Sequence, residues 1–340
     1  MSSALLSTVA FIAVASASVT VLGEEDTEPT TQAHLWWKGL DLPLYPATLS
    51  EAPDIPSPAV TADGVEVVTV CLVDGRCVLT PVTIENGEPY CLSHHRYGKG
   101  RQLAINTGDF PALGRVGLHS ETELDSKERI TGRPVWLIDV IGRPGAFSHG
   151  GFFAEDESIL SVLKGDNRLV TSLGLTHPQL ARPLFHMWNL SLIDGETRLF
   201  KLGRKGSAID HVWYNGRKVR LSIIGTKGYQ ESIFHDEIQG GSDIHIWCDL
   251  EPGEHDYLSK RYGHLGEERL SGLIDRLSHL HIGEMAPFYA MRYGFYEGHT
   301  SYRADPIAVA FIFRLISLVE IDQALGGHLY EALTEHFRVR

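Results

Sequence analysis

The chain has 340 residues, of which 43% are hydrophobic and 21% are charged, so it is long and apolar enough to bury a substantial core. This composition excludes general disorder. With 30 basic and 43 acidic residues the formal net charge is −13, and no cluster of Lys and Arg stands out. A nucleic-acid partner is therefore not expected, because binding to phosphate backbones requires a basic surface.

The first 23 residues predict an export signal. Residues 4–22 carry no charge, and small residues at 15–17 and 21–23 offer the spacing at which a signal peptidase cuts. No Lys or Arg precedes this apolar run, so an uncleaved N-terminal anchor is the alternative. In both cases we expect the protein to be secreted or periplasmic, with membrane contact only through this segment if it is retained.

The rest of the chain predicts one globular domain at 61–340, with two subdomains that meet near residue 195 as the alternative. Residues 24–60 are predicted to be a polar, then Pro-rich, tether and irregular segment before it.

Four cysteines, Cys71, Cys77, Cys91 and Cys248, allow two disulfides in an exported protein, with three pairings. The first two flank a predicted hairpin. A two-residue turn would place their thiols on opposite faces of the sheet, and a three-residue turn would place them directly opposite one another. The register of this hairpin decides the pairing, and four buried thiols are the alternative.

The first half of the globular region predicts strands and then helices. Strands are expected within 65–145, at 65–73, 76–84, 101–108 and 133–142, where β-branched and apolar residues are frequent. The last of these is almost continuously apolar, which favours a central strand. A helical block follows at about 154–192, in which Thr176 is the expected N-cap of a helix with Pro178 in its first turn.

The second half repeats this order. Strands are expected within 198–250: a hairpin around Asn215-Gly216, then strands at 231–238 and 242–250. The block at about 256–338 is predicted to be helical, with an N-cap at Asp305 before an apolar helix and a capping box at 317–320. This order indicates an α+β fold with mainly antiparallel sheets, rather than a doubly wound α/β fold.

The strongest candidate site is "RYGFYEGHTSYRADP" at 292–306, which concentrates polar side chains between two helices that require burial. One interpretation is a catalytic site, with Glu297 and His299 as a proton-handling pair and Arg303 binding an anion or carboxylate. The preferred interpretation is structural: these side chains satisfy the backbone of a long connection. His281 is a further candidate, expected to point inward from the end of the preceding helix.

A second candidate is "GAFSHGGFFAED" at 145–156. Ser148 lies in a sequence similar to the nucleophile elbow of hydrolases, but position 146 is Ala, and Gly and Pro separate Ser148 from the predicted strand. We therefore predict a Gly-rich loop and retain Ser148 as a secondary candidate.

The same stretch also resembles the zinc site of D-alanyl-D-alanine peptidases. His149, Ala154 and Asp156 have the spacing of His-x-x-Gly-x-Ala-x-Asp, and "LEPGEH" at 250–255 supplies His255 as a third ligand. The match departs from the family where Phe152 replaces Gly and where Gly253-Glu254 replaces Trp. The resemblance implies zinc held by His149, Asp156 and His255, and it makes zinc a candidate cofactor.

Together these features favour an exported hydrolase that acts on a cell-envelope or extracellular substrate, with His/Glu acid–base chemistry and zinc as a candidate cofactor. The substrate class is a small molecule, a peptide or a glycan. The alternative is a non-catalytic binding or structural module outside the cytoplasm that uses an aromatic surface.

Overall fold

The computed structural model describes residues 34–37, 40–45, 59–60, 66–72, 77–81, 84–85, 88–89, 135–190, 209–234 and 239–334. The predicted export signal, the predicted strand at 101–108 and Cys91 lie outside these residues. Within them, no helix is both long and apolar enough to cross a membrane.

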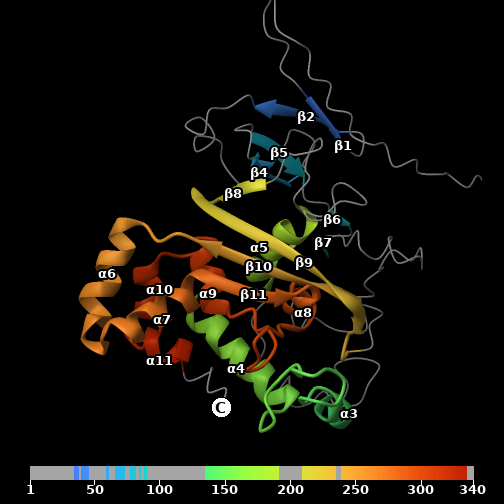
Figure 1. The fold of residues 1–340 in the computed structure, drawn as a ribbon, viewed down its shortest axis with the longest axis vertical. Coiled ribbons are helices and arrows are strands. Elements are labelled where there is room, and N and C mark those ends of the chain that lie inside the picture. The colour runs from blue at the N-terminus through green and yellow to red at the C-terminus, as the bar shows by residue number, and fades with distance from the viewer. Residues whose placement is uncertain are drawn as a thin grey trace, which may run out of the picture.

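The described strands form one antiparallel sheet with the order β1-β2-β5-β4-β8-β9-β10-β11, in which β3 also pairs with β4 (Figure 1). The strands are β1 (His34–Trp37), β2 (Leu40–Tyr45), β3 (Ala59–Val60), β4 (Glu66–Leu72), β5 (Cys77–Pro81), β8 (Ile209–Tyr214), β9 (Arg217–Glu231), β10 (Gln239–Cys248) and β11 (His279–Gly283). A separate small pair joins β6 (Ile84–Glu85) to β7 (Glu88–Pro89). The α+β class with an antiparallel sheet is therefore confirmed.

Two hairpins follow their predicted turn chemistry. Asn215 and Gly216, between β8 and β9, both have positive φ angles, 47° and 71°, as a type I′ turn requires. In the β4–β5 hairpin Cys71 lies directly opposite Cys77, the arrangement expected for a three-residue turn. Cys71 is disulfide-bonded, whereas Cys248 is a free buried thiol.

The described helices are α3 (Val135–Ile141), α4 (Ile159–Ser172), α5 (His177–Leu190), α6 (Pro252–Tyr262), α7 (Glu267–Ser278), α8 (Ala286–Tyr293), α9 (Pro306–Ile312), α10 (Leu318–Ala324) and α11 (Leu329–Thr334). The caps are those predicted. Thr176 Oγ1 accepts from the backbone N–H of Gln179 (3.4 Å), and Asp305 accepts from Ile307 N–H (2.8 Å). Ser317 and Glu320 form the predicted capping box.

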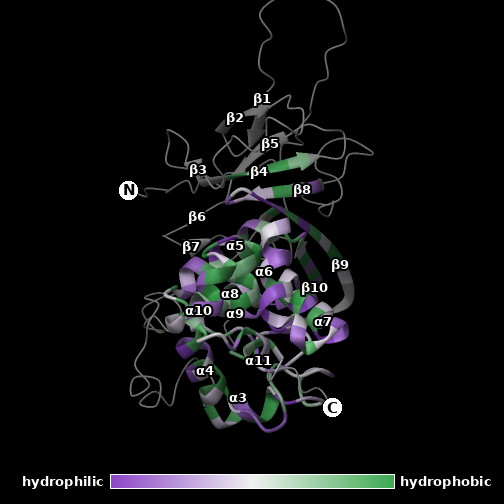
Figure 2. Ribbon diagram, turned by 90° about the vertical axis from the view of Figure 1, so that its left-hand side faces the viewer, coloured by the Kyte–Doolittle hydropathy of each residue, from purple (hydrophilic) through white to green (hydrophobic). Residues whose placement is uncertain are grey.

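Helices cover one face of the sheet. Figure 2 shows β9 and β10 along one edge of the molecule, with α5, α8 and α9 to their left. Alternate strand residues point toward these helices and are buried, as Ile244, Ile246 and Leu280 illustrate. All seven residues of α9 are buried, which confirms the prediction of a buried helix.

Four local predictions are wrong. Residues 135–141 form α3 rather than a central strand, and its Trp136 side chain is 66% exposed. Within the block 256–338, predicted to be helical, α7 ends at Ser278, because His279–Gly283 pairs with β10 as strand β11. Ile233 and Phe234 are in a turn rather than in the strand predicted at 231–238, of which residues 235–238 lie outside the described part of the chain.

The fourth error concerns residues 24–60, predicted to be a tether and an irregular segment, because His34–Trp37 and Leu40–Tyr45 pair as strands β1 and β2. His186, on α5, is fully buried, and its ring packs on Tyr214 with centroids 5.4 Å apart. The position of a polar residue on a helix does not show whether a neighbouring strand packs an aromatic ring against it.

Candidate functional site

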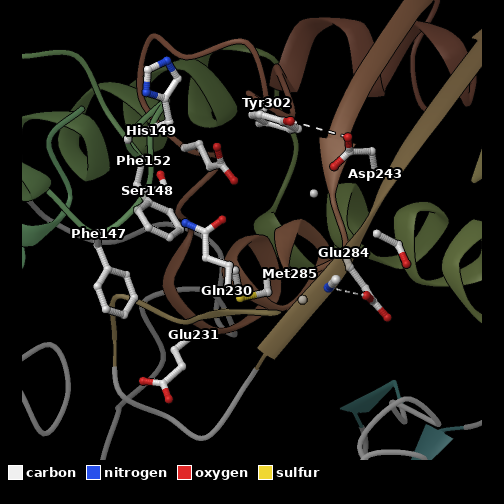
Figure 3. Close-up of a pocket in the computed structure, with 17 residues that line it drawn as sticks. Phe147, Ser148, His149, Phe152, Gln230, Glu231, Asp243, Glu284, Met285 and Tyr302 are labelled. Atoms are coloured by element: carbon white, nitrogen blue, oxygen red, sulfur yellow. Dashed lines mark hydrogen bonds between the residues drawn. The ribbon is translucent and has the colours of Figure 1, made fainter. Parts of the chain in front are cut away.

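A cavity of about 690 Å³ opens where four segments meet (Figure 3). These segments are the loop after α3, the adjoining ends of β9 and β10, the end of β11, and the connection between α8 and α9. The lining residues are Phe147 to Phe152, Gln230, Glu231, Gly240 to Asp243, Gly283 to Met285, Glu297 and Tyr302. Pockets with convergent polar groups are the usual location of ligand sites in proteins.

Carboxyl groups dominate the polar lining of this cavity. Glu231, Asp243, Glu284 and Glu297 all contribute to it, and none of the lining residues is Lys or Arg. The Glu284 carboxylate accepts a hydrogen bond from the Gly241 backbone N–H (2.9 Å), which fixes it against the start of β10.

Glu297, one of the predicted site residues, is almost completely buried. It is 5% exposed, and its carboxylate accepts a hydrogen bond from the Thr300 hydroxyl (3.1 Å). Burial raises the pKa of Glu297 to about 8, against the smaller opposing effects of the Thr300 hydrogen bond and the Arg303 charge. Glu297 is therefore protonated at neutral pH and is able to donate a proton into the cavity.

The backbone at Glu297 is strained. Its φ of 62° is in the left-handed region, which costs a non-glycine residue about 1–2 kcal/mol. The conformation is held by two hydrogen bonds: Arg303 donates to the Glu297 carbonyl, and Gly298 N–H donates to the Phe152 carbonyl (2.7 Å). Gly298 must be Gly, since a Cβ there would lie 2.4 Å from the Phe153 Cβ.

Asp243 lies on the wall formed by β10. Tyr302 OH donates to its carboxylate (3.5 Å), and His281 Nε2 lies 3.6 Å from the same oxygen, Oδ2. The Tyr302–Asp243 contact is drawn in Figure 3. Because His281 occupies a strand rather than a helix end, it does not point into the core. It shares the outer face of the sheet with His279, which corrects the predicted inward orientation.

Arg303 does not face the cavity but binds two carboxylates in the interior. Its guanidinium donates to Asp166 on α4 (2.6 Å) and to Asp305 (3.3 Å), and all three side chains are at most 4% exposed. Burial raises the pKa of Asp166 to about 6 although Arg303 opposes this shift, so the carboxylate is still ionised at neutral pH. The Asp166 carboxylate also accepts from Tyr296 N–H (3.2 Å). Arg303 is therefore a structural clasp between α4 and the 294–305 connection.

His299 pairs with Glu157 rather than with Glu297, so the predicted proton-handling pair is not formed. Its ring contacts the Glu157 carboxylate, and its backbone N–H donates to the same group (2.9 Å). Burial raises the pKa of Glu157, but the hydrogen bonds from His299 and Ala154 outweigh it and lower the pKa to about 2. This pair attaches the loop that carries Ser148 and His149 to the 294–305 connection.

The loop 142–158 is Gly-rich, as predicted, and has no nucleophile elbow. α3 precedes it where an elbow requires a strand, and no helix begins until Ile159. Gly145 N–H donates to the Ser148 carbonyl (2.8 Å), and Ser148 and His149 reach the cavity rim.

The three proposed zinc ligands are not brought together. His149 and Asp156 are exposed in the loop after α3, whereas His255 is exposed on α6 at the other side of the molecule (Figure 1). Within the parts of the chain that the structure describes, no three His, Cys, Asp or Glu residues form a group that could hold a metal ion. The spacing that resembles a zinc peptidase is thus not accompanied by the geometry of its site.

Of the residues that the sequence indicated as site candidates, Glu297, Ser148 and His149 line this cavity and His281 lies beside it, whereas Asp243 and Tyr302 were missed. The alternation in 242–250 placed Asp243 and His245 on one face of a strand, and this signal could have identified Asp243. Glu157, the partner of His299, lies 142 residues earlier, and no local pattern connects the two.

Comparisons with protein-family models, with curated proteins and with solved structures found no significant match to this chain.

Proposed function

We propose that the protein is a hydrolase that uses two carboxyl groups for acid–base catalysis, with a glycan as its substrate. The observation that carries the proposal is that Glu297 and Asp243, in contrasting environments, line one cavity of about 690 Å³. Pairs of carboxyl groups whose surroundings separate their protonation states are typical of acid and base assignments in enzymes.

The proposed roles follow from these surroundings. Glu297, with its pKa raised to about 8 by burial, is the general acid and protonates the leaving oxygen. Asp243, with Tyr302 and His281 beside its carboxylate, is the base that takes a proton from the attacking water. The remaining hydroxide forms the new bond, so one water is consumed and two hydroxyl groups result. Cleavage of glycosidic bonds requires this combination of a protonated and an ionised carboxyl group.

The proposal places the enzyme outside the cytoplasm, secreted or periplasmic, and its substrate in the cell envelope or the extracellular space. Two features support this location. Residues 4–22 have the uncharged, small-residue character of an export signal. Cys71 is disulfide-bonded, and disulfides persist mainly in oxidising compartments. The proposal assigns no role to zinc at His149, Asp156 and His255, because these residues lie apart.

The test is hydrolysis of a panel of glycans by the purified protein, with a panel of peptides in parallel. We expect Glu297→Gln, which keeps the shape of a protonated carboxyl group, to reduce kcat/KM by about 10²–10⁴-fold. Glu268→Gln is the matched control, because Glu268 is exposed on α7 and remote from the cavity lining. Undiminished activity in Glu297→Gln contradicts the assignment, and cleavage of peptides alone contradicts the substrate class.

A non-catalytic binding module is the second candidate, and exposed aromatic side chains favour it. Trp136 is 66% exposed on α3, and Phe147, at the cavity rim, is 38% exposed. This candidate predicts that the protein binds a glycan without cleaving it. Binding would then be weakened by Trp136→Ala or Phe147→Ala and unaffected by Glu297→Gln.

A further inference from the structure

Three histidine rings stack on the outer face of the sheet, across β10 and β11. His245 lies opposite His281 in the strand register, and their rings are nearly parallel, with centroids 4.2 Å apart and an angle of 5°. His245 also stacks on His279, at 5.5 Å and 19°, and their Nδ1 and Nε2 atoms lie 3.2 Å apart. These residues, His279, His245 and His281, are called the histidine row below.

The row ends at the cavity. The His281 ring packs on Tyr302 with centroids 4.5 Å apart, and its Nε2 faces Asp243 Oδ2 at 3.6 Å. Tyr302 and Asp243 are both part of the cavity lining. The histidine row therefore connects the solvent-exposed edge of the sheet, at His279, to the carboxylate proposed as the base.

The geometry of the row favours proton binding over metal binding. The ligands of one metal ion direct their lone pairs at a common point, whereas parallel stacked rings hold theirs in separate planes. Stacked imidazoles this close do not all carry a charge, since adjacent like charges repel strongly. Consistent with this, burial, followed by the charges of His281 and His279, lowers the pKa of His245.

Charges around the row favour His281 as the ring that holds a proton. Asp243 is the carboxylate that acts on His245 and faces His281. From β9, Ser222 lies opposite His245, and Arg220 lies opposite Trp247. Arg220 is neutralised by Asp249 (2.7 Å), and the remaining neighbour, Tyr302, is uncharged. A proton on His281 thus lies directly beside a counter-charge, since its Nε2 is 3.6 Å from Asp243 Oδ2.

We infer that the histidine row holds a proton on His281 next to Asp243 and thereby keeps Asp243 ionised, which makes His281 a positioning residue for the base. Its effect on rate rests on the proposed function, but its effect on charge does not. As the pH falls through the usual range of histidine, the positive charge of His281 opposes protonation of Asp243. The acidic limit of activity is then lower than that of an isolated carboxylate.

The first measurement is the pH profile of kcat/KM in His281→Gln. Removing the positive charge should move the acidic limb to higher pH by about 0.5–1 unit, the effect of one partly screened opposite charge. His279→Gln is the matched control: it lies on the same strand and also stacks on His245, but no contact joins it to Asp243. The acidic limb of the His279→Gln profile should move by less than half as much. A uniform loss of rate at every pH, with both limbs unmoved, would show a merely structural role and overturn the inference.

The second measurement needs no activity. Side-chain NMR of the histidine rings in the wild-type protein and in Asp243→Asn follows proton binding directly. We expect the titration midpoint of His281 to fall by about 0.5–1 pH unit in Asp243→Asn and that of His279 to stay in place. An unchanged His281 midpoint contradicts the inference. A shifted midpoint in a protein that cleaves no glycan supports the inference and rejects the proposed function alone.

Discussion

Two side chains of the same short connection, Arg303 and Glu297, are both buried but have opposite surroundings. Arg303 has its charge matched by Asp166 and Asp305, and its side chain lies away from the cavity. Glu297 lies six residues earlier, with the Thr300 hydroxyl on its carboxyl group, and it lines the cavity. One connection thus provides both a structural clasp and a candidate catalytic group.

The two environments have opposite consequences for a buried charged residue. A buried ion with matched counter-charges maintains the fold, and removing one partner leaves the others uncompensated. A buried carboxyl group that lacks such a partner becomes neutral instead, so its pKa rises. When this group also borders a cavity, it is a candidate proton donor. The structural interpretation of residues 292–306 therefore applies to Arg303, and the proposed catalytic role is assigned to Glu297.

The largest expected effect is that of Arg303→Ala. It leaves Asp166 and Asp305 buried without a counter-charge and the Glu297 carbonyl without its donor, so the free energy of unfolding should fall by about 3–5 kcal/mol. Denaturant unfolding at pH 7 measures the change. Arg269→Ala, at an exposed position of α7, is the control and should change the unfolding free energy by less than about 0.5 kcal/mol. Equal stabilities for the two variants would show that the contacts of Arg303 with Asp166 and Asp305 do not stabilise the fold.

A smaller effect is expected from His299→Ala, which removes the partner of Glu157. We expect a loss of about 1 kcal/mol at pH 7, because the pair is partly exposed, and faster amide hydrogen exchange in the loop 145–157. The folded-state pKa of Glu157, about 2, is below its ordinary value of 4.5. Its contribution to stability is therefore present above pH 4.5 and is lost as the pH falls toward 2.

The pH dependence also provides the check on this prediction. The difference in stability between wild type and His299→Ala should shrink steadily from pH 4.5 to pH 2. A difference that is constant over this range would mean that packing of the ring, rather than its contact with the carboxylate, holds the loop in place.

Local signals in the sequence predicted much of the second half of the fold. The turn at Asn215-Gly216, the N-cap at Asp305 and the capping box at Ser317 each depend on residues close together in the chain, so they are visible without tertiary structure. The wrong predictions are in segments whose secondary structure is decided by tertiary contacts. Residues 135–141 are apolar enough for a strand or a helix, and periodicity cannot separate the two in so short a run. Residues 279–283 continue a helical pattern, but pairing with β10 makes them a strand.

The candidate site was predicted in part for the same reason. Glu297 was identified because it lies in a conspicuous polar stretch between apolar helices. Its assumed partner was wrong, because neighbours in sequence need not be neighbours in space: His299 binds Glu157, while Asp243 reaches the cavity from another strand. Spacing alone also suggested zinc at His149, Asp156 and His255, although α6 holds His255 apart from the other two.

As a proton donor Glu297 must be neutral at physiological pH, and its own titration measures this. Carboxyl ¹³C NMR of glutamate-labelled protein, assigned by the signal that disappears in Glu297→Gln, follows the protonation of this group. The proposed role of Glu297 predicts a transition near pH 8, far above the ordinary glutamate value of 4.5. A Glu297 signal that titrates near pH 4.5 would contradict it, because an ionised Glu297 at neutral pH could not serve as the proton donor.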